Sequence, residues 1–412
     1  MRFKIRGKVF VPMVAALLAL VLVIFWVLNH QLTRVSNEFI TEIGQSKVEE
    51  INSSMELSFR EAESVSALFA RLPEVSEAYR VALSGNIDDP ASPESQEARE
   101  MLRYVLRDML DSFEAIRGEP LMIHFHLPNG RSLVRLWREK NFIRDGQGID
   151  ESDDISKFRQ TVMYVNRTGT SAQGLEIGRG GFTVRNVLPV TSPRGEQLGS
   201  VEMLIEFEPI VEAAAAGDGQ ELLLYMNHDL LSIAQRLQDE SRHPIIDKRF
   251  VKVSGTDDPQ INNLITRNIL EQGTQELTVE TAGKYSLVVF PLEDFTGNQV
   301  GVMAYILDTS NQNALIRNLT ITLLSIMAVL LLLLMVIGQL SIRYAVMNPL
   351  NKIVGFAGKV AKGDLDQKLE ISTRDEMQDL GGSLQTMVDN LKEKIAEAQH
   401  KSEEARKETE KA

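Results

Sequence analysis

The chain has 412 residues, of which 43% are hydrophobic and 25% are charged, and its formal net charge at pH 7 is −13. An acidic chain without a strongly basic block is not suited to binding nucleic acid, so we exclude a nucleic-acid partner. The chain contains no cysteine, which excludes disulfides, thiolate nucleophiles, iron–sulfur clusters and cysteine-based zinc sites.

Two apolar stretches, residues 9–33 and 318–342, contain no Asp, Glu, Lys or Arg. Each is longer than the ~20 residues that a helix needs to cross a bilayer, so we predict two transmembrane helices. The tail of residues 1–8 carries four basic residues and no acidic one, and basic residues also follow the second stretch. The positive-inside rule therefore predicts that both termini are cytoplasmic and that residues 34–317 lie outside. A cleaved signal peptide is the alternative for the first stretch, but its apolar region would be shorter.

The outer region begins with helical patterns. Residues 34–84 keep apolar or small residues at helical spacing and predict one long helix, which Pro73 is expected to kink. Turn-forming residues follow, and residues 95–112 predict a second helix with apolar residues on one side.

The pattern then changes to strands. Residues 121–127 and 131–137 alternate around the turn Pro128-Asn-Gly and predict a hairpin. A distal PAS-like unit, about residues 113–210, is completed by a predicted helix at 156–166 and strands at 175–177, 182–191 and 197–207. A proximal PAS-like unit, about residues 220–310, is predicted from a strand at 222–227, a helix at 261–270 and strands at 285–291 and 299–307. We therefore predict an α+β sensor: a long N-terminal helix followed by two antiparallel sheet units.

Several basic and aromatic residues fall on the predicted strands of the distal unit. Because side chains alternate along a strand, one face is expected to carry the candidate ligand-binding residues His124, His126, Arg131, Arg135 and Trp137. Arg185 lies in the middle of a third strand, where a buried charge needs a partner, and Glu202 is the remaining candidate. Guanidinium groups bind carboxylates in a bidentate manner, so these residues favour a carboxylate-bearing ligand. Alternatively, Arg131 and Arg135 pair with Glu176 or Glu202, or the face is solvated.

Other chemistry finds no support in the sequence. His124 and His126 could bind a metal, but no third ligand stands at a usual spacing, so hydrogen-bonded histidines are the preferred interpretation. The glycines at 178–181 precede a predicted strand and not a helix, which excludes a phosphate loop. No set of residues resembles a hydrolase or paired-carboxylate site. We expect neither an enzyme nor a metal or cofactor site in this chain.

After the second apolar stretch, apolar residues recur in steps of four and three, which is a coiled-coil seam. Gly363 and Leu365 interrupt the seam, and a second helix begins at Arg374. Two such short amphipathic helices cannot bury their seams alone, so two copies are expected to form a parallel four-helix bundle. The residues expected to relay a signal are Pro349, Leu350, Ile353, Gly363, Leu365, Asp375, Glu376, Met377 and Leu391. Beyond Leu391 the spacing shifts, which predicts a phase break before the coiled coil of residues 393–412.

These patterns resemble known signalling families. Residues about 35–310 resemble the double Cache sensory domains of bacterial receptors. Two motifs, Phe125-His-Leu-Pro with Arg131-Ser-Leu-Val-Arg-Leu136, and Gly174-Leu-Glu-Ile-Gly-Arg-Gly-Gly181, are similar to the variant described as the double sensory domain of two-component sensor kinases. Residues 343–392, with Pro349, Gly363 and Asp375-Glu376, resemble a HAMP domain. Arg135-Leu-Trp137 also resembles the Arg-x-Trp element of amino-acid-binding double Cache receptors, although Arg138 stands where an aromatic residue is usual.

The resemblance implies a two-pass homodimer in the bacterial inner membrane, with a periplasmic sensor that binds a small molecule in its distal unit. We expect the N-terminal part of a methyl-accepting chemotaxis protein, which would signal to a kinase complex of the CheA and CheW type through a further output domain. The alternative is the input half of a sensor histidine kinase or of a cyclic-dinucleotide signalling enzyme.

Overall fold

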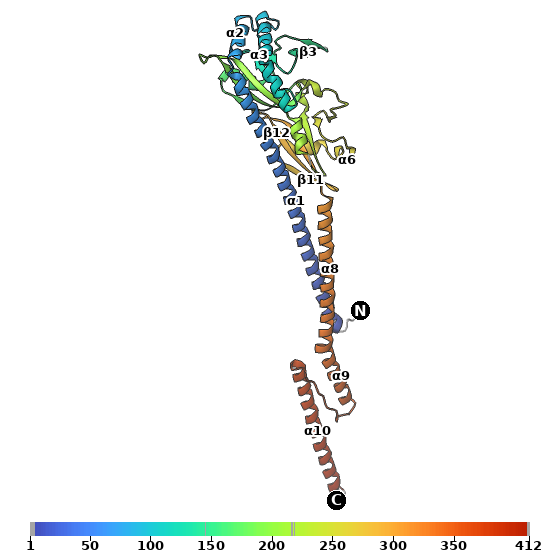
Figure 1. The fold of residues 1–412 in the computed structure, drawn as a ribbon. Coiled ribbons are helices and arrows are strands. Elements are labelled where there is room, and N and C mark those ends of the chain that lie inside the picture. The colour runs from blue at the N-terminus through green and yellow to red at the C-terminus, as the bar shows by residue number, and fades with distance from the viewer. Residues whose placement is uncertain (1–4, 145, 216, 218, 410–412) are drawn as a thin grey trace. The chain divides into compact units, whose positions relative to one another are not determined.

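The computed structural model describes residues 5–144, 146–215, 217 and 219–409. The first four residues of the predicted tail and the last three of the predicted coiled coil lie outside the described residues. The chain divides into two compact units: a central unit, residues 34–313, and a terminal unit formed by the residues before and after it. Figure 1 shows the elements of both.

The described part of the terminal unit consists of helices and one extended connector. Helix α1 runs without a break over Ile5–Ala70, so the first apolar stretch continues into the first helix of the central unit. The second apolar stretch lies within α8, Ser310–Ser341, which continues through a π-helical segment, η3, Ile342–Met347, into α9, Asn348–Val360. Both apolar helices are long enough to cross a membrane, with a mean hydropathy of 2.9 in their most apolar windows. Leu20, Trp26 and Leu332 are exposed on them, as is expected of side chains that face lipid.

The helices after the second apolar stretch follow the predicted pattern. Pro349 lies in the first turn of α9, where proline is tolerated because its missing N–H is not needed. Gly363 has a φ of +93° and ends that segment. An extended connector leads to α10, Glu376–Thr409, and Oδ1 of Asp375 accepts a hydrogen bond from the backbone N–H of Met377 at the start of this helix. Ile353 is buried, whereas Leu391 and other seam residues of α10 are exposed in the single chain.

In the central unit, three helices cover the first sheet. The chain leaves the helical conformation at Arg71–Leu72, and Pro73 is the first residue of α2, Pro73–Ser84. Proline therefore starts a new helix here and does not kink the predicted one. Helix α3, Pro93–Arg117, begins at Ser92, whose Oγ accepts a hydrogen bond from the backbone N–H of Ser95 at 3.3 Å.

The first module, residues 73–206, consists of the first sheet and the helices α2, α3 and α4. Its five strands are antiparallel in the order β2-β1-β7-β6-β5. A separate hairpin, β3 and β4, and helix α4 complete the module. The bounds are β1 Ile123–His126, β2 Ser132–Arg135, β3 Phe142–Arg144, β4 Gln147–Ile149, α4 Gln160–Thr168, β5 Ala172–Gly178, β6 Gly181–Thr191 and β7 Gln197–Glu206.

The second module, residues 208–308, has a six-stranded sheet in the order β11-β12-β13-β8-β10-β9. The helix predicted at 261–270 is two short helices, α6 and α7, and β9, β10 and β11 were not predicted. The bounds are α5 Glu208–Ala214, β8 Gln220–Asn227, η1 His228–Ser232, η2 Gln235–Leu237, β9 Ile245–Ile246, β10 Phe250–Ser254, α6 Pro259–Asn262, α7 Arg267–Gly273, β11 Thr278–Ala282, β12 Tyr285–Glu293 and β13 Gln299–Asp308. The fold class is thus confirmed: a long helix and two antiparallel sheet units.

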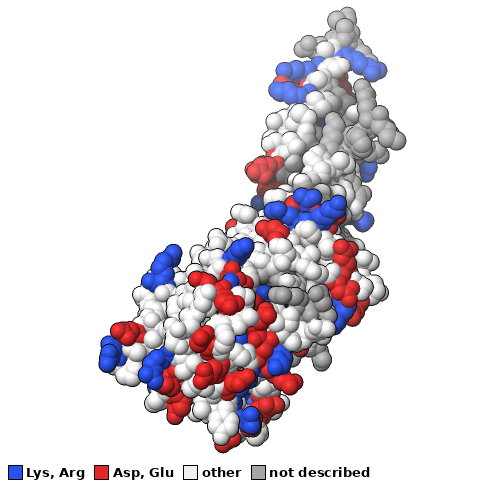
Figure 2. All heavy atoms as spheres, turned by 90° about the horizontal axis from the view of Figure 1, so that it is seen from above, with Lys and Arg blue, Asp and Glu red and all other residues white. Residues whose placement is uncertain are grey.

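One apolar cluster joins the two modules. Phe182 of the first sheet and Met303 of the second belong to it, together with Ile40 and Ile51 of α1. Gly301 allows the close approach, because a side-chain carbon there would lie 2.7 Å from Cζ of Phe182. On the outer face seen in Figure 2, by contrast, basic and acidic side chains are interspersed.

Candidate functional site

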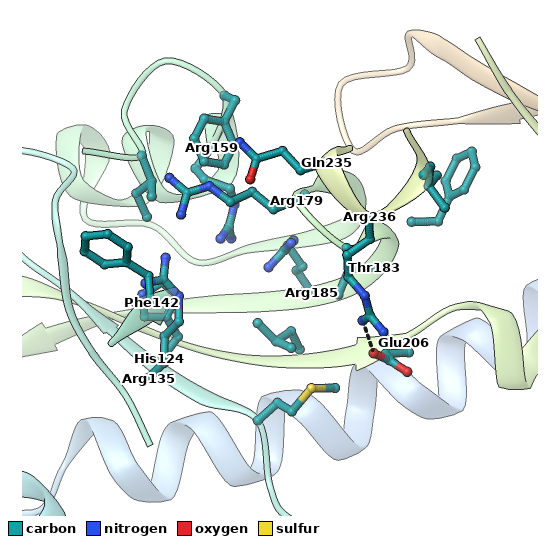
Figure 3. Close-up of a pocket in the computed structure, with 18 of the residues that line it drawn as sticks. His124, Arg135, Phe142, Arg159, Arg179, Thr183, Arg185, Glu206, Gln235 and Arg236 are labelled. Carbon is teal, nitrogen blue, oxygen red and sulfur yellow. Dashed lines mark hydrogen bonds and ion pairs between the residues drawn. The ribbon is translucent and has the colours of Figure 1, made fainter. Parts of the chain in front are cut away.

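A pocket of about 540 Å³ lies on the face of the first sheet that is turned away from α2 and α3. Its volume is in the range of small-molecule sites. Strands β1, β2, β6 and β7 contribute to its floor, and the turn at Arg179 and residues 235–243 of the second module contribute to its wall. Figure 3 shows arginine side chains from several of these segments converging on the pocket.

A β-bulge decides which predicted residues reach the pocket. In the pairing of β1 with β2, His124 lies opposite Arg135 and Phe125 opposite Val134, but His126 lies opposite Ser132. Leu133 is therefore an extra residue, which shifts the alternation of β2 by one. The prediction that Arg131 shares a face with Arg135 is wrong for this reason. Arg131 is not among the residues that line the pocket, and its Nη1 donates a hydrogen bond to the backbone oxygen of Ser152 at 2.9 Å.

Glu202 is a fully buried carboxylate beneath the pocket floor. It lies opposite His124 in the pairing of β1 with β7. Both terminal nitrogens of Arg159 donate to it, and Nη1 of Arg185 does so at 3.2 Å. Burial alone would raise the pKa of Glu202, but the charges of Arg159 and Arg185 lower it well below its usual value. The carboxylate is therefore ionised.

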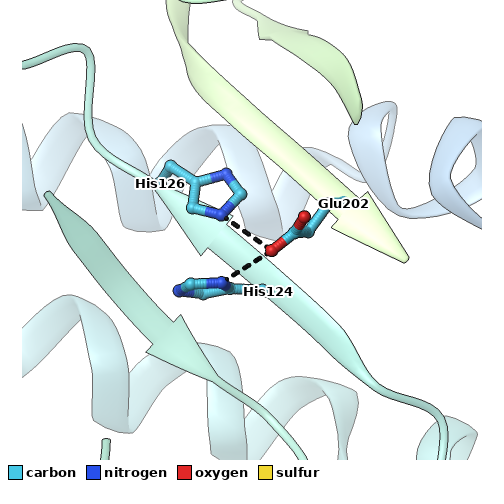
Figure 4. Close-up of side chains that lie close together, drawn as sticks. All are labelled: His124, His126 and Glu202. Atoms are coloured by element: carbon cyan, nitrogen blue, oxygen red, sulfur yellow. Dashed lines mark hydrogen bonds and ion pairs between the residues drawn. The ribbon is translucent and has the colours of Figure 1, made fainter. Parts of the chain in front are cut away.

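The two histidines of β1 meet the same carboxylate oxygen (Figure 4). Nδ1 of His124 lies 2.8 Å and Nε2 of His126 lies 3.2 Å from Oε1 of Glu202. Nε2 of His124 is also 2.6 Å from Oγ of Ser132. Burial is the main cause of the lowered pKa of both histidines. Both are therefore neutral at pH 7 and hydrogen-bonded.

These three residues have the geometry of a metal-ligand set, with all three ligand atoms within 4.8 Å of one another. The sequence did not reveal Glu202 as a possible third ligand. Glu202 lies beside the histidines because β7 pairs with β1, and its position along the chain gives no sign of this contact. Two guanidinium groups already neutralise Glu202, however, so the cluster offers a cation no net negative charge. The hydrogen-bonded interpretation is therefore the one that the contacts favour.

The other buried charges of the floor are also paired. Arg159 donates from Nε to Glu176 at 2.8 Å, and Thr161 donates to Glu176 from its backbone N–H at 3.0 Å. Nη1 of Arg135 donates to Asp153 at 2.8 Å, and Arg179 lies 2.9 Å from the same carboxylate. The alternative predicted that Arg131 and Arg135 pair with Glu176 or Glu202, and these partners are wrong. The buried charges of the floor are nevertheless paired, as that alternative expected.

Arg185 makes fewer hydrogen bonds than Arg135 and Arg159, the other buried arginines of the floor. Its side chain is only 5% exposed. Among the described residues its one hydrogen bond is the donation to Glu202; its Nε makes no hydrogen bond, although it lies 3.4 Å from Oε2 of Glu176 and is ion-paired with it. Its Nη2 occupies the space beside Gly178, where a side-chain carbon would lie 2.4 Å away. Burial, followed by the charge of Arg159, lowers its pKa. Arg185 is thus a cation at the pocket with unused donors.

Of the seven candidate residues, His124, Arg135, Trp137 and Arg185 line the pocket. The ring of Trp137 meets that of His124 edge-on, with 6.0 Å between centroids. His126 and Glu202 lie behind the lining and hold it, and Arg131 lies elsewhere. The sequence did not point to the five further arginines of the lining, most of which lie outside the regular helices and strands, namely Arg138, Arg159, Arg179, Arg236 and Arg242.

The strands below the pocket are tied to helix α2. The hydroxyl of Tyr79 donates to a pair of backbone oxygens, those of His126 at 2.9 Å and Ser200 at 2.8 Å. Gly199 makes room for the ring, because a side-chain carbon there would lie 2.5 Å from Cε1 of Tyr79. A shift of β1 against β7 would therefore be felt directly by α2.

Two family models match the chain. Residues 86–312 match a family described as the double sensory domain of two-component sensor kinase. Residues 342–393 match the HAMP domain.

Solved structures with a similar fold include sensory domains of several receptor types. The sensor domain of the histidine kinase DctB of V. cholerae is 11% identical, with a TM-score of 0.36, and the match covers 66% of this chain and 98% of that one. The ligand-binding domain of the Campylobacter jejuni chemoreceptor Tlp3, in complex with L-valine, is 9% identical, with a TM-score of 0.37 and coverage of 67% and 94%. A domain of a sensory box/GGDEF family protein from Vibrio parahaemolyticus is 13% identical, with a TM-score of 0.37 and coverage of 67% and 97%.

Proposed function

Because the chain belongs to the family of double sensory domains of two-component sensor kinases and carries a HAMP domain, it is a transmembrane sensor, and we propose that it detects a carboxylate-bearing small molecule as the input part of a chemotaxis receptor. Sensor and HAMP domains are signalling modules that do not themselves catalyse a reaction. In this proposal the ligand binds on the first sheet, and the signal passes through α1, α8 and the HAMP helices.

The observation that carries the ligand class is the state of Arg185. Its guanidinium is ion-paired with Glu176 and Glu202 but makes a single hydrogen bond, so most of its buried donors lack an acceptor, which is costly unless a ligand supplies one. A carboxylate matches the planar donor fork of arginine and would complete its hydrogen bonds. Trp137 and Phe142 line the same pocket and offer apolar walls for the rest of a small molecule.

The topology of the proposal follows the charge of the flanks. Residues 1–8 and 343–412 are cytoplasmic, residues 9–33 and 318–342 cross the inner membrane, and residues 34–317 are periplasmic. Within the cytoplasmic part, residues 343–392 form the HAMP domain. A homodimer is expected because Leu380, Met387 and Leu391 form an apolar seam on α10 that is exposed in one chain. Its output would control a kinase complex of the CheA and CheW type.

A sensor histidine kinase is the second candidate, because the description of the matching family names two-component sensor kinases. Reading the gene beyond residue 412 distinguishes the two. A long methylatable helical hairpin supports the chemotaxis receptor, whereas a phosphoacceptor histidine with an ATP site supports the kinase.

Isothermal titration of the full chain in lipid nanodiscs with amino acids and short carboxylates tests the pocket. Charge-assisted hydrogen bonds contribute about 1.5–3 kcal/mol each, so we expect Arg135→Ala and Arg185→Ala each to weaken binding roughly tenfold or more. Arg131→Ala is the matched control, since Arg131 follows the same turn but does not line the pocket. Unchanged affinity in both pocket variants would show that the proposed site is wrong.

A further inference from the structure

Residues 228–243 of the second module, here named the closing segment, contribute to the wall of a pocket that otherwise belongs to the first module. The segment connects β8 to β9 and includes η1 and η2. It is fixed on the first module by a backbone hydrogen bond from Arg236 N–H to the oxygen of Arg179, 3.0 Å long. Leu237 is buried and lies against Gly181, where a side-chain carbon would be 3.3 Å from its Cδ1.

The closing segment brings extra positive charge to the pocket. The inner arginines at positions 135, 159, 179 and 185 already share the buried carboxylates at 153, 176 and 202. Arg138, Arg236 and Arg242 line the outer part and are exposed. Among the described residues, Arg138 and Arg242 have no carboxylate within ion-pair distance, and Arg236 reaches Glu206 only at 3.5 Å (Figure 3).

The outer arginines are close enough to influence one another. Burial and then the charges of Arg135, Arg236 and Arg179 lower the pKa of Arg138. Glu206 and Glu208 also line the pocket, and burial followed by the charge of Glu206 raises the pKa of Glu208. Counting these two with the three buried carboxylates, seven arginines face five acidic groups. The free pocket thus keeps a surplus of positive charge at its rim, and like charges from two modules repel each other there.

We propose that the ligand carries two or more acidic groups and bridges the modules, one group pairing with Arg185 on β6 and another with Arg138 and Arg236 at the rim. This inference rests on the proposed function and adds to it the number of acidic groups and the part played by the second module. The unused donors of Arg185 and the surplus of one positive charge at the rim are separate observations, and each can be met by its own acidic group. Carboxylates and phosphates share the required chemistry, since both accept hydrogen bonds from guanidinium groups.

Binding of such a ligand would hold the closing segment to the first module. A monoanion can satisfy Arg185 but leaves the rim repulsive. A molecule with two acidic groups replaces the repulsion between Arg138 and Arg236 by a shared counter-charge. The ligand would therefore act on the contact between the modules as well as on the first sheet.

The test measures the affinity of the full chain in nanodiscs for two anion series: acetate, succinate and tricarballylate, and inorganic phosphate and pyrophosphate. We expect at least one multiply acidic member to bind about tenfold more tightly than acetate or phosphate in the same series. Arg236→Gln should remove this advantage, so that the multiply acidic member binds no more tightly than acetate or phosphate in its series. Arg249→Gln, an exposed arginine of the second module outside the pocket, is the matched control.

Each result of this test either supports or refutes the bridge between the modules. A preference within the carboxylate series or within the phosphate series supports the bridge and assigns its chemistry. If Arg236→Gln behaves like Arg249→Gln, or if no multiply acidic anion binds, the bridge is refuted. If acetate binds and loses affinity in Arg185→Gln while Arg236→Gln changes nothing, the carboxylate pocket stands and only the bridge fails.

Discussion

Replacing Glu202 by glutamine removes the one negative charge on which four buried donors converge. Arg159 and Arg185 would remain in the core with Glu176 as their one shared carboxylate, so one buried positive charge would lose its counter-charge, and the two histidines would face an amide in place of a carboxylate. Removing one partner of a buried ion pair costs about 3–5 kcal/mol, because an uncompensated charge stays buried. At about 2–4 °C per kcal/mol for a domain of this size, the melting temperature should fall by roughly 10 °C.

The assay is thermal unfolding of the full chain in nanodiscs, followed by intrinsic fluorescence, at several pH values. The folded pKa of Glu202 is lowered, so its stabilising effect is complete above the unfolded value of about 4.3 and is lost as the pH falls through the folded value. The difference between wild type and Glu202→Gln should therefore be constant from pH 6 to 8. Glu206→Gln, whose side chain is 55% exposed, is the control and should change the melting temperature little. Equal melting temperatures for the two variants would refute the reasoning.

Three further predictions concern the first module and helix α10. Gly199→Ala places a carbon 2.3 Å from a backbone oxygen of β1 and should lower the free energy of unfolding by about 1–3 kcal/mol. Gly180→Ala, with no neighbour closer than 3.8 Å, is the control and should leave that free energy unchanged. Thermal unfolding measures both variants, and similar values would contradict the close-packing argument. His124 and His126 are neutral when folded, because burial lowers their pKa, but bind protons below about pH 6.5 when unfolded, so stability should fall as the pH drops from 6.5 to 5.5. His124→Asn should reduce this dependence and leave the part that His126 contributes, and an unchanged slope would count against it. The chain has no cysteine, so an introduced cysteine can form a disulfide only with its copy in a second chain. Leu391→Cys, on the proposed seam, should form a disulfide dimer in membranes under mild oxidation, and Glu393→Cys, off the seam, should not. Equal cross-linking of the two variants would argue against the seam.

The features that the sequence predicted well are those with long, regular patterns. The apolar stretches, the helix through residues 34–70 and the strands β6, β7, β12 and β13 each repeat one period over many residues. The short strands β3, β4, β9, β10 and β11 have five residues or fewer, too few for alternation to stand out from a loop. The single helix predicted at 261–270 is in fact interrupted. Thr266 caps a new helix, because its side-chain oxygen accepts a hydrogen bond from the backbone N–H of Ile269.

The site was predictable only as far as the alternation of each strand held. His124 and Arg185 were found because a basic residue inside a strand is conspicuous. Arg131 was misplaced because a bulge at Leu133 shifts the alternation, and a single sequence carries no signal for that extra residue. The pairing of Arg159 with Glu202 joins residues 43 positions apart and depends on how α4 packs on the sheet, which no spacing rule could supply.

The closing segment has a practical meaning for the exchange of sensory parts between receptors. The boundary between the modules along the chain does not coincide with the boundary of the pocket, because Arg236 and Arg242 come after the first sheet is complete. A chimaera that transfers only the first module would carry an incomplete binding site and would combine its floor with a foreign rim. Under the proposed function, a chimaera is expected to keep the ligand specificity of this chain only when residues through at least 243 are transferred together.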